Sequence, residues 1–401
     1  MSASSPASFS EPAASASGRR ARLIAFYLPQ YHPIPENDRW WGAGFTEWTN
    51  VARARPLFRG HHQPNLPADL GFYDLRVPET RAAQAALAAA AGIEGFCYWH
   101  YWFAGKQILE RPFNEVLSSG EPDFPFCLGW ANQSWTGIWH ASPEKILIGQ
   151  TYPGRDDHER HFHAILPALL DRRHLRVNDR PVFLIFRPTE LPRAGEMIEL
   201  WQQLAARNGL PGIHFIAHSL AIDPHDYRAD GFAGAVYADT FRVTRMNAWQ
   251  RALRLARAGP EPDVRPLPPL ARLRALARAV ELKARKHWYA RPRVFAYREA
   301  MLYFLDSLAE APDSYPCVVP NWDNSPRTGR NALVFHDSTP DLFQSHLRSA
   351  LRLAARRPFD ERLVFVKSWN EWAEGNYLEP DARHGRGFLD AVRAEAVVAA
   401  P

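Results

Sequence analysis

The sequence predicts an α/β fold, a single (β/α)8 barrel of the TIM type. Short runs of consecutive apolar residues recur along the 401-residue chain, and such runs are typical of strands buried on both faces of a parallel sheet. Segments with a helical spacing of Leu and Ala separate these runs, and an alternation of strands with helices indicates an α/β sheet. Eight repeats favour a closed barrel. A doubly wound open sheet is the main competing fold.

The eight expected strands are short and rich in apolar residues. In chain order they are residues 22–30, 93–102, 124–130, 181–186, 213–219, 234–239, 317–322 and 363–368. The clearest expected helix is residues 78–91, which opens with Pro-Glu and stops at Gly92, in keeping with the preference for Pro at a helix start and Gly past its end. Further helices are expected over residues 157–172, 194–208, 340–356 and 386–399.

Two insertions interrupt the repeat. Residues 31–77, after the first strand, are rich in Trp, His, Pro and Gly, and a long loop of this kind is usually functional. Residues 240–313, after the sixth strand, are expected to form a helical insertion, and between 251 and 298 Arg and Lys far outnumber Asp and Glu. Residues 1–20 are an Ala/Ser/Pro-rich segment that we expect to be a disordered tail, which leaves 21–401 as one barrel domain.

Composition restricts the function classes. A net charge of +5 is mild for this length and does not by itself indicate nucleic acid. No apolar stretch approaches the roughly 18 residues of a membrane span, and the first residues lack the order of a signal peptide. The three cysteines lie in apolar runs, as expected of reduced core thiols. We therefore expect a cytoplasmic protein with no integral membrane segment and no nucleic-acid partner.

Polar and aromatic residues follow nearly every expected strand. Because the strand C-termini of a barrel meet at one face, where active sites lie, these residues predict a polar, Trp-lined pocket. The chain has 14 Trp against 4 Met, and an indole face can stack on a sugar ring. The candidate substrate-binding residues at this face and in the first insertion are Tyr31, His32, Trp40, Trp41, Glu47, Trp48, His100, Tyr101, Trp130, Asn132, Gln133, Trp135, Asp239, Asn321, Trp322, Asp323, Trp369, Asn370 and Trp372.

Glu371 and Glu374 follow the eighth expected strand and are the candidate catalytic residues. Paired carboxylates are the usual means of breaking a glycosidic bond. If the chain turns helically there, the two side chains stand about 5–6 Å apart at Cβ, which suits a retaining pair better than an inverting one. The alternative interpretation is a solvated helix start, where acidic residues favour the helix dipole.

Other catalytic classes have weaker support. Glu371 and Glu379 match a spacing of two acids found in some two-domain nucleotide-sugar transferases, but no pair of Rossmann-like halves is evident. The chain contains no Asp-x-Asp motif, no Gly-rich phosphate loop and no Cys or His cluster at metal-ligand spacing. We therefore expect neither a metal nor another cofactor.

Several longer motifs resemble those of a known family. They occupy residues 26–33, 40–51, 63–74, 97–103 and 369–372, and they resemble the WbsX-like proteins, which are related to glycoside hydrolase family 99. The resemblance covers roughly residues 22–382. It implies a (β/α)8 barrel and, by analogy with family 99, retaining chemistry on α-mannosides without a metal.

The resemblance also implies separate roles for the two acids. Glu371 matches the base that deprotonates the 2-hydroxyl of the sugar and so gives a 1,2-anhydro intermediate, and Glu374 matches the general acid and base. One departure is Gln133, where the family often has an acidic residue; this puts any third carboxylate role there in doubt.

These observations predict an enzyme acting on α-glycosidic bonds of a mannose-like bacterial surface polysaccharide. A glycosyltransferase in O-antigen or lipopolysaccharide biosynthesis is the first alternative, and a non-catalytic glycan-binding module is the second. The expected partner is a glycan or a lipid-linked oligosaccharide. The basic residues 251–298 form a solvated face or a peripheral contact with anionic lipid.

Overall fold

Eight parallel strands form a barrel, as predicted. The computed structural model describes residues 18–137, 142–258, 291–306, 308, 311 and 313–397. The strand order is β11-β10-β9-β5-β2-β1-β16-β13, and a parallel bridge between Val236 and Tyr315 brings the two ends of this sheet together. The barrel strands are β1 Arg22–Tyr27, β2 Gly95–His100, β5 Phe126–Trp130, β9 Arg180–Ile185, β10 His214–Ser219, β11 Gly234–Tyr237, β13 Cys317–Val318 and β16 Leu363–Val366.

Aromatic rings fill the barrel interior. Phe26 of β1 stacks on Trp99 of β2 at 4.8 Å and on Phe365 of β16 at 5.4 Å. His218 of β10 meets the edges of both Phe26 and Trp99. Gly129 of β5 leaves the room that the Trp99 ring occupies, since a Cβ there would lie 3.0 Å from that ring. The barrel is thus a packed core, as in other barrels of this type.

The expected seventh strand, residues 317–322, is wrong as one continuous element. Only Cys317–Val318 pairs within the barrel, alongside β16. Pro320 lacks a backbone donor and so cannot continue a strand ladder. Beyond it, β14 Trp322–Asp323 joins a separate three-stranded sheet with β15 Leu333–His336 and β12 Arg293–Ala296.

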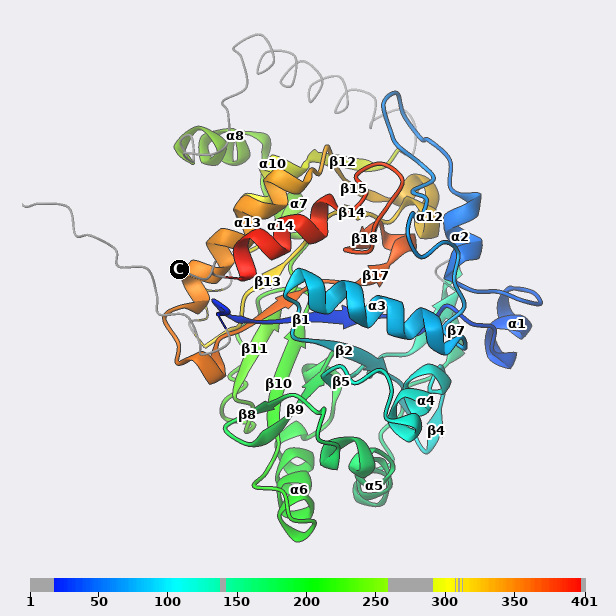
Figure 1. Cartoon of the computed structure of the whole chain (residues 1–401), viewed down its shortest axis with the longest axis vertical. Coiled ribbons are helices and arrows are strands. Elements are labelled where there is room, and N and C mark those ends of the chain that lie inside the picture. Colours follow the sequence, from blue (N-terminus) through cyan, green and yellow to red (C-terminus); the bar gives the residue numbers. More distant parts are fainter. Residues whose placement is uncertain are drawn as a thin grey trace, which may run out of the picture.

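Helices pack around the outside of the barrel (Figure 1). All five expected helices are present, as α3 Pro78–Ala91, α5 Arg155–Leu170, α6 Ala194–Arg207, α13 Pro340–Ala354 and α14 Gly387–Ala396. Gly92 ends α3 in the left-handed conformation with φ 91°, which explains the need for glycine there. An additional helix, α4 Arg111–Ser119, carries Pro112 in its first turn and was not predicted.

The two insertions follow the C-terminal ends of β1 and β11. The first contains α1 Pro35–Trp41 and α2 Glu47–Arg53. In the second, α7 Arg242–Arg245, α8 Ala248–Arg257 and α10 Tyr297–Ala300 are described. Residues 259–290, which include most of the predicted basic segment 251–298, and residues 1–17 of the predicted tail lie outside the described residues. Among the helices of the described ranges, none has the length and apolar content required to cross a bilayer.

We predict that Gly95→Ala destabilises the barrel. A Cβ at Gly95 would lie 2.5 Å from the carbonyl oxygen of Pro125, so β2 would have to move away from the chain that enters β5. Overpacking of this kind costs about 1–3 kcal/mol, and urea unfolding measures it. Gly149→Ala is the control, because the nearest atom to its added Cβ is 3.9 Å away in Ile146. Equal stability of the two variants would contradict the close approach.

Candidate active site

The segment after β16 folds back on itself and presents both candidate acids. It runs through β17 Asn370–Glu371, a 3-10 turn at Trp372–Glu374 and β18 Asn376–Tyr377. Gly375 closes the turn with φ 53°, and a Cβ there would lie 2.8 Å from Asp323. The tight turn keeps Glu371 and Glu374 within one compact hairpin.

Asn370 fixes this hairpin to the end of β1. Its side-chain oxygen accepts a hydrogen bond from the Leu28 backbone N–H at 2.8 Å, and its amide donates to the Leu28 carbonyl at 3.1 Å. The Ser368 hydroxyl accepts from the Glu371 N–H at 2.9 Å, and the Tyr31 hydroxyl accepts from the Trp372 N–H at 3.1 Å. The backbone that carries the glutamates is therefore held from both sides.

Arg327 joins three carboxylates. Its Nη1 donates to Glu371 Oε1 at 3.1 Å and to Glu374 Oε1 at 2.6 Å, and its Nη2 lies 3.0 Å from Glu47 Oε1. Two oxygens hydrogen-bonded to one nitrogen at these distances are no more than about 6 Å apart, which is closer than the roughly 6.5–9.5 Å of an inverting pair. Arg327 lies in α12 Ser325–Thr328 and Glu47 in α2.

Glu374 is surrounded by groups that favour its protonated form. Burial and the nearby Glu371 carboxylate together raise the pKa of Glu374 to about 7, although the Arg327 guanidinium opposes the increase. Burial also raises the pKa of Glu47, against the effect of Arg327. A substantial fraction of Glu374 therefore carries its proton near neutral pH and can donate it, as a general acid must.

A fourth acid, Glu379, lies beneath the hairpin. It is only 2% exposed, and it accepts hydrogen bonds from Trp372 Nε1 at 2.6 Å, Gln84 Nε2 at 2.6 Å and the Tyr73 hydroxyl at 2.9 Å. Burial raises the pKa of Glu379 to about 7 although these donors lower it. Its contacts hold Trp372, which stacks on Tyr377 at 3.8 Å, so Glu379 supports the hairpin from inside.

Many predicted substrate-binding residues have partners inside the protein. Asn132 bridges β5 to β9 through the backbone N–H and carbonyl of Arg187. His100 lies 2.9 Å from His161 between ring nitrogens, and burial lowers its pKa to about 4. The predicted residues that are buried in this way are Tyr31, His32, Trp48, His100, Trp130, Asn132, Trp369, Asn370 and Trp372. Their direct contact with a substrate stays a prediction.

Other predicted residues lie at the surface of the strand ends. Trp40 and Trp135 are half-buried with ring centroids 5.9 Å apart, and Trp135 meets the edge of Tyr101 at 5.3 Å. The Glu371 carboxylate helps burial to raise the pKa of Tyr101, which places this aromatic group near the candidate acids. Trp41, Gln133 and Asn321 are also half-buried.

Two predicted aspartates already have charged or polar partners. Asp239 forms an ion pair with Arg245. Asp323 accepts hydrogen bonds from His61 Nε2 at 2.7 Å and Gln63 Nε2 at 2.5 Å. Trp322, next to Asp323, is buried with the Lys367 ammonium 5.6 Å from its ring.

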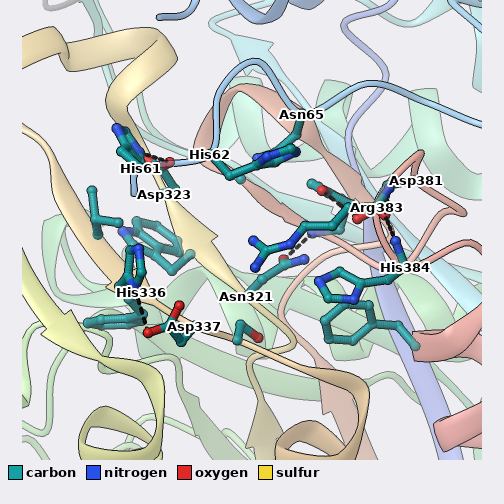
Figure 2. Close-up of a pocket in the computed structure, with 17 residues that line it drawn as sticks. His61, His62, Asn65, Asn321, Asp323, His336, Asp337, Asp381, Arg383 and His384 are labelled. Carbon is teal, nitrogen blue, oxygen red and sulfur yellow. Dashed lines mark hydrogen bonds and ion pairs between the residues drawn. The ribbon is translucent and has the colours of Figure 1, made fainter. Parts of the chain in front are cut away.

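A small pocket with a volume of about 60 Å³ borders the hairpin at Gly375 (Figure 2). Histidines, aspartates and Arg383 line it, and these residues come from several separate segments. Within the described part of the chain, no three His, Cys, Asp or Glu side chains are arranged to hold a metal ion. All three cysteines are buried and free.

Arg327 is the central residue that sequence reasoning did not identify. It lies four residues beyond Asp323 on the segment that follows the seventh strand, and neither a motif nor a spacing marks it. Arg327 contacts Glu47 of the first insertion and the two glutamates of the hairpin. These contacts join parts of the chain that are distant in sequence, so no local pattern predicts them.

We predict that stability depends on pH through Glu374. Its pKa is about 7 in the folded chain against an ordinary value of 4.5. Between these two pH values the folded chain keeps this carboxyl group protonated, whereas the unfolded chain has lost the proton. The stabilisation of the folded state by protonated Glu374 is fully present below about pH 4.5 and is lost as the pH rises through about 7. The free energy of unfolding should then fall over this range by at most about 1.4 kcal/mol per pH unit for each such group.

Urea unfolding between pH 5 and 8 measures this slope. Glu374→Gln should flatten the slope without removing it, because Glu379 contributes in the same direction. Glu199→Gln is the control, since Glu199 is exposed on α6. If Glu374→Gln kept the slope of the wild type, the elevated pKa of Glu374 would be contradicted.

Solved structures with this architecture include carbohydrate-active enzymes. A glycoside hydrolase-like protein matches with a TM-score of 0.59 at 12% identity, over 98% of both chains. An endo-α-mannosidase of family GH99 from Bacteroides thetaiotaomicron, solved with bis-tris-propane, matches with a TM-score of 0.54 at 14% identity, over 93% of this chain and 95% of that one. At these identities the likeness shows the fold, and it confirms the (β/α)8 barrel.

The sequence itself has more closely related proteins. Uncharacterized proteins WxcX from two strains of Xanthomonas campestris pv. campestris are 38% identical over 384 residues, which is 95% of this chain and 50% of each relative. The chain thus spans about half the length of these curated relatives. The model of the family described as Glycosyltransferase WbsX matches residues 23–392. Because this match covers most of the chain, the chain belongs to the WbsX glycosyltransferase family.

Proposed function

We propose that the chain is a retaining enzyme that acts on α-glycosidic bonds of a mannose-like bacterial surface polysaccharide, with Glu371 as base and Glu374 as acid. The observation that carries the proposal is that both carboxylates accept hydrogen bonds from the same Arg327 Nη1, which brings them closer together than the roughly 6.5–9.5 Å of an inverting pair. The elevated pKa of Glu374, about 7, supports its role as proton donor.

In the first proposed step, the Glu371 carboxylate removes the proton of the sugar 2-hydroxyl. The resulting oxygen attacks C1 and forms the C1–O2 bond of a 1,2-anhydro sugar while the glycosidic C1–O bond breaks. Glu374 gives its proton to the departing oxygen.

In the second step, Glu374, now ionised, removes a proton from an incoming hydroxyl group. That oxygen attacks C1 and opens the three-membered ring, and Glu371 returns its proton to O2. Both acids end in their starting states, and two inversions at C1 give net retention. No step requires a cofactor.

The acceptor decides between hydrolysis and transfer. Water gives a hydrolase, and a sugar hydroxyl gives a transferase that uses the same two glutamates. The description of the family as a glycosyltransferase favours transfer in O-antigen or lipopolysaccharide biosynthesis as the second candidate, with a lipid-linked oligosaccharide as a possible substrate. A cytoplasmic location remains a prediction from the sequence.

We predict that Glu371→Gln and Glu374→Gln each abolish glycan processing while the chain stays folded. Removing a general acid or base usually costs about 100- to 10,000-fold in rate. Mass spectrometry of bacterial surface polysaccharides incubated with each variant measures the products, with and without added sugar acceptors. Glu199→Gln serves as the matched control because Glu199 is exposed on α6, away from the hairpin. Retained processing in both active-site variants would contradict the mechanism. Glycan binding without processing by the wild type would favour a non-catalytic glycan-binding role.

We predict an alkaline limit to activity near pH 7. The first step needs protonated Glu374, so kcat/KM should fall as the pH rises through the pKa of about 7. Arg327→Met removes the cation that lowers this pKa and should move the limit upward, by about one unit or more. The pH profile of kcat/KM for each protein tests this. A limit that stayed in place in Arg327→Met would show that another group controls it.

A further inference from the structure

The helix α8 in the second insertion has its apolar and charged faces reversed with respect to an ordinary surface helix. Trp249, Ala252, Leu253 and Ala256 follow the i, i+3, i+4, i+7 spacing that places side chains on one face of a helix. All four residues are exposed, and Trp249 is 76% exposed. A surface helix usually turns such an apolar face toward the core, whereas in α8 this face points outward.

Two arginines occupy the inner face of α8 instead. Arg251 forms an ion pair with Glu299 of α10 at 2.5 Å. Arg254 donates to Asp306 Oδ2 at 3.0 Å and to the Leu302 carbonyl at 2.6 Å. These contacts fix the rotation of α8 about its own axis, so the apolar face cannot turn inward unless both ion pairs break.

Exposed apolar side chains are concentrated on this helix. Nine large hydrophobic side chains are exposed among the described residues, and three of them, Trp249, Leu253 and Leu255, belong to this ten-residue helix. A cluster of exposed apolar side chains marks a site of interaction with a protein or a membrane. Figure 1 shows α8 at the edge of the molecule, so a large, flat partner can approach it.

The charge around α8 indicates the class of partner. Residues 239–258 and 291–306 contain eight arginines against three acidic residues. Residues 259–290, which connect these two segments in sequence, also hold more Arg and Lys than Asp and Glu. The ion pairs of α8 therefore leave a net positive charge in this part of the chain, and such a charge attracts a negatively charged surface.

The size of the apolar face favours a membrane over a protein. A helix of ten residues is about 15 Å long and about 10 Å wide, so one face covers about 150 Å². A specific protein interface buries about 800 Å² on each partner. A bilayer sets no such requirement, because an amphipathic helix inserts its apolar side chains only about 5–10 Å into the headgroup region, where Trp is enriched.

We propose that α8 is a docking surface for an anionic lipid bilayer. Trp249 and Leu253 insert among the lipid headgroups, and the excess of arginine around α8 attracts the lipid phosphates. The sequence alone allowed a solvated face for residues 251–298, but the apolar outer face of α8 favours the contact with lipid. The proposal goes beyond catalysis, because no residue of the hairpin that carries Glu371 and Glu374 takes part.

Co-sedimentation of the full chain with lipid vesicles tests the proposal without turnover. The chain should bind vesicles of equal parts phosphatidylcholine and phosphatidylglycerol about tenfold or more tightly than vesicles of phosphatidylcholine alone, because anionic lipid attracts basic residues. Trp249→Gln should weaken binding to the mixed vesicles about tenfold or more, since a large apolar side chain no longer leaves water, and Leu253→Gln should act in the same direction.

Two control variants make the result specific. Leu170→Gln is the matched control for Leu253→Gln, because Leu170 is an exposed leucine at the end of α5, and it should leave vesicle binding unchanged. Glu374→Gln should also bind vesicles like the wild type, so failure of the catalytic proposal is separable from failure of this one.

A fluorescent label reports whether α8 itself enters the bilayer. The three native cysteines are buried, so Leu253→Cys provides an exposed thiol for an environment-sensitive nitrobenzoxadiazole dye. Its emission should shift to the blue when mixed vesicles are added, and the same dye on Leu170→Cys should not shift.

Several outcomes would overturn the proposal. They are the absence of vesicle binding, equal binding to both kinds of vesicle, binding that Trp249→Gln leaves unchanged, and a label at position 253 that does not respond. Self-association that Trp249→Gln abolishes, without vesicle binding, would assign the face to a second copy of the chain. A large loss of stability to urea in Trp249→Gln, again without vesicle binding, would show that the chain itself covers the face.

Discussion

One guanidinium joins three parts of the chain at the face where the barrel strands end. Arg327 contacts Glu47 from the first insertion and both glutamates of the hairpin after β16. Three carboxylates this close would repel strongly without a cation, and removing one partner from a buried ionic group is far more costly than the net stability that the group provides. The cluster is therefore better understood as a device that fixes position and protonation than as a source of stability.

The barrel supplies a rigid frame for this cluster. Aromatic rings such as Phe26 and Trp99 fill its interior, so the strand ends cannot move independently. Asn370 transfers this rigidity to the hairpin by hydrogen bonding both backbone groups of Leu28. Function in this fold depends on the groups placed at the strand ends, because barrels of the same architecture support many reactions.

Much of the fold could be predicted because strong local signals determine it. Consecutive apolar residues marked all eight barrel strands, and Gly92 marked the end of α3. The predicted seventh strand was too long because the apolar pattern continues past Pro320, whereas the hydrogen-bonded pairing of the strand cannot. Glu371 and Glu374 could be put forward as candidate acids because they follow a strand within one short motif, and their catalytic roles stay a prediction.

The rest of the site depends on contacts that no local pattern records. Arg327 contacts Glu47, which is 280 residues away in the sequence. The sequence likewise gave no sign of the hydrogen bonds between Asn132 and Arg187. Tryptophan content suggested stacking platforms, yet Trp130, Trp369 and Trp372 are buried. An indole is both the largest apolar side chain and a good partner for sugars, so composition alone could not separate a core role from a binding role.

The Asn370 contact with Leu28 has a consequence for the order in which the molecule is completed. The same side chain joins the first and last barrel strands and anchors the two proposed catalytic acids, so closure of the barrel and assembly of the catalytic pair coincide. During synthesis, a growing chain carries neither glutamate until nearly the whole barrel has been made. Incomplete chains on the ribosome thus lack both proposed catalytic acids.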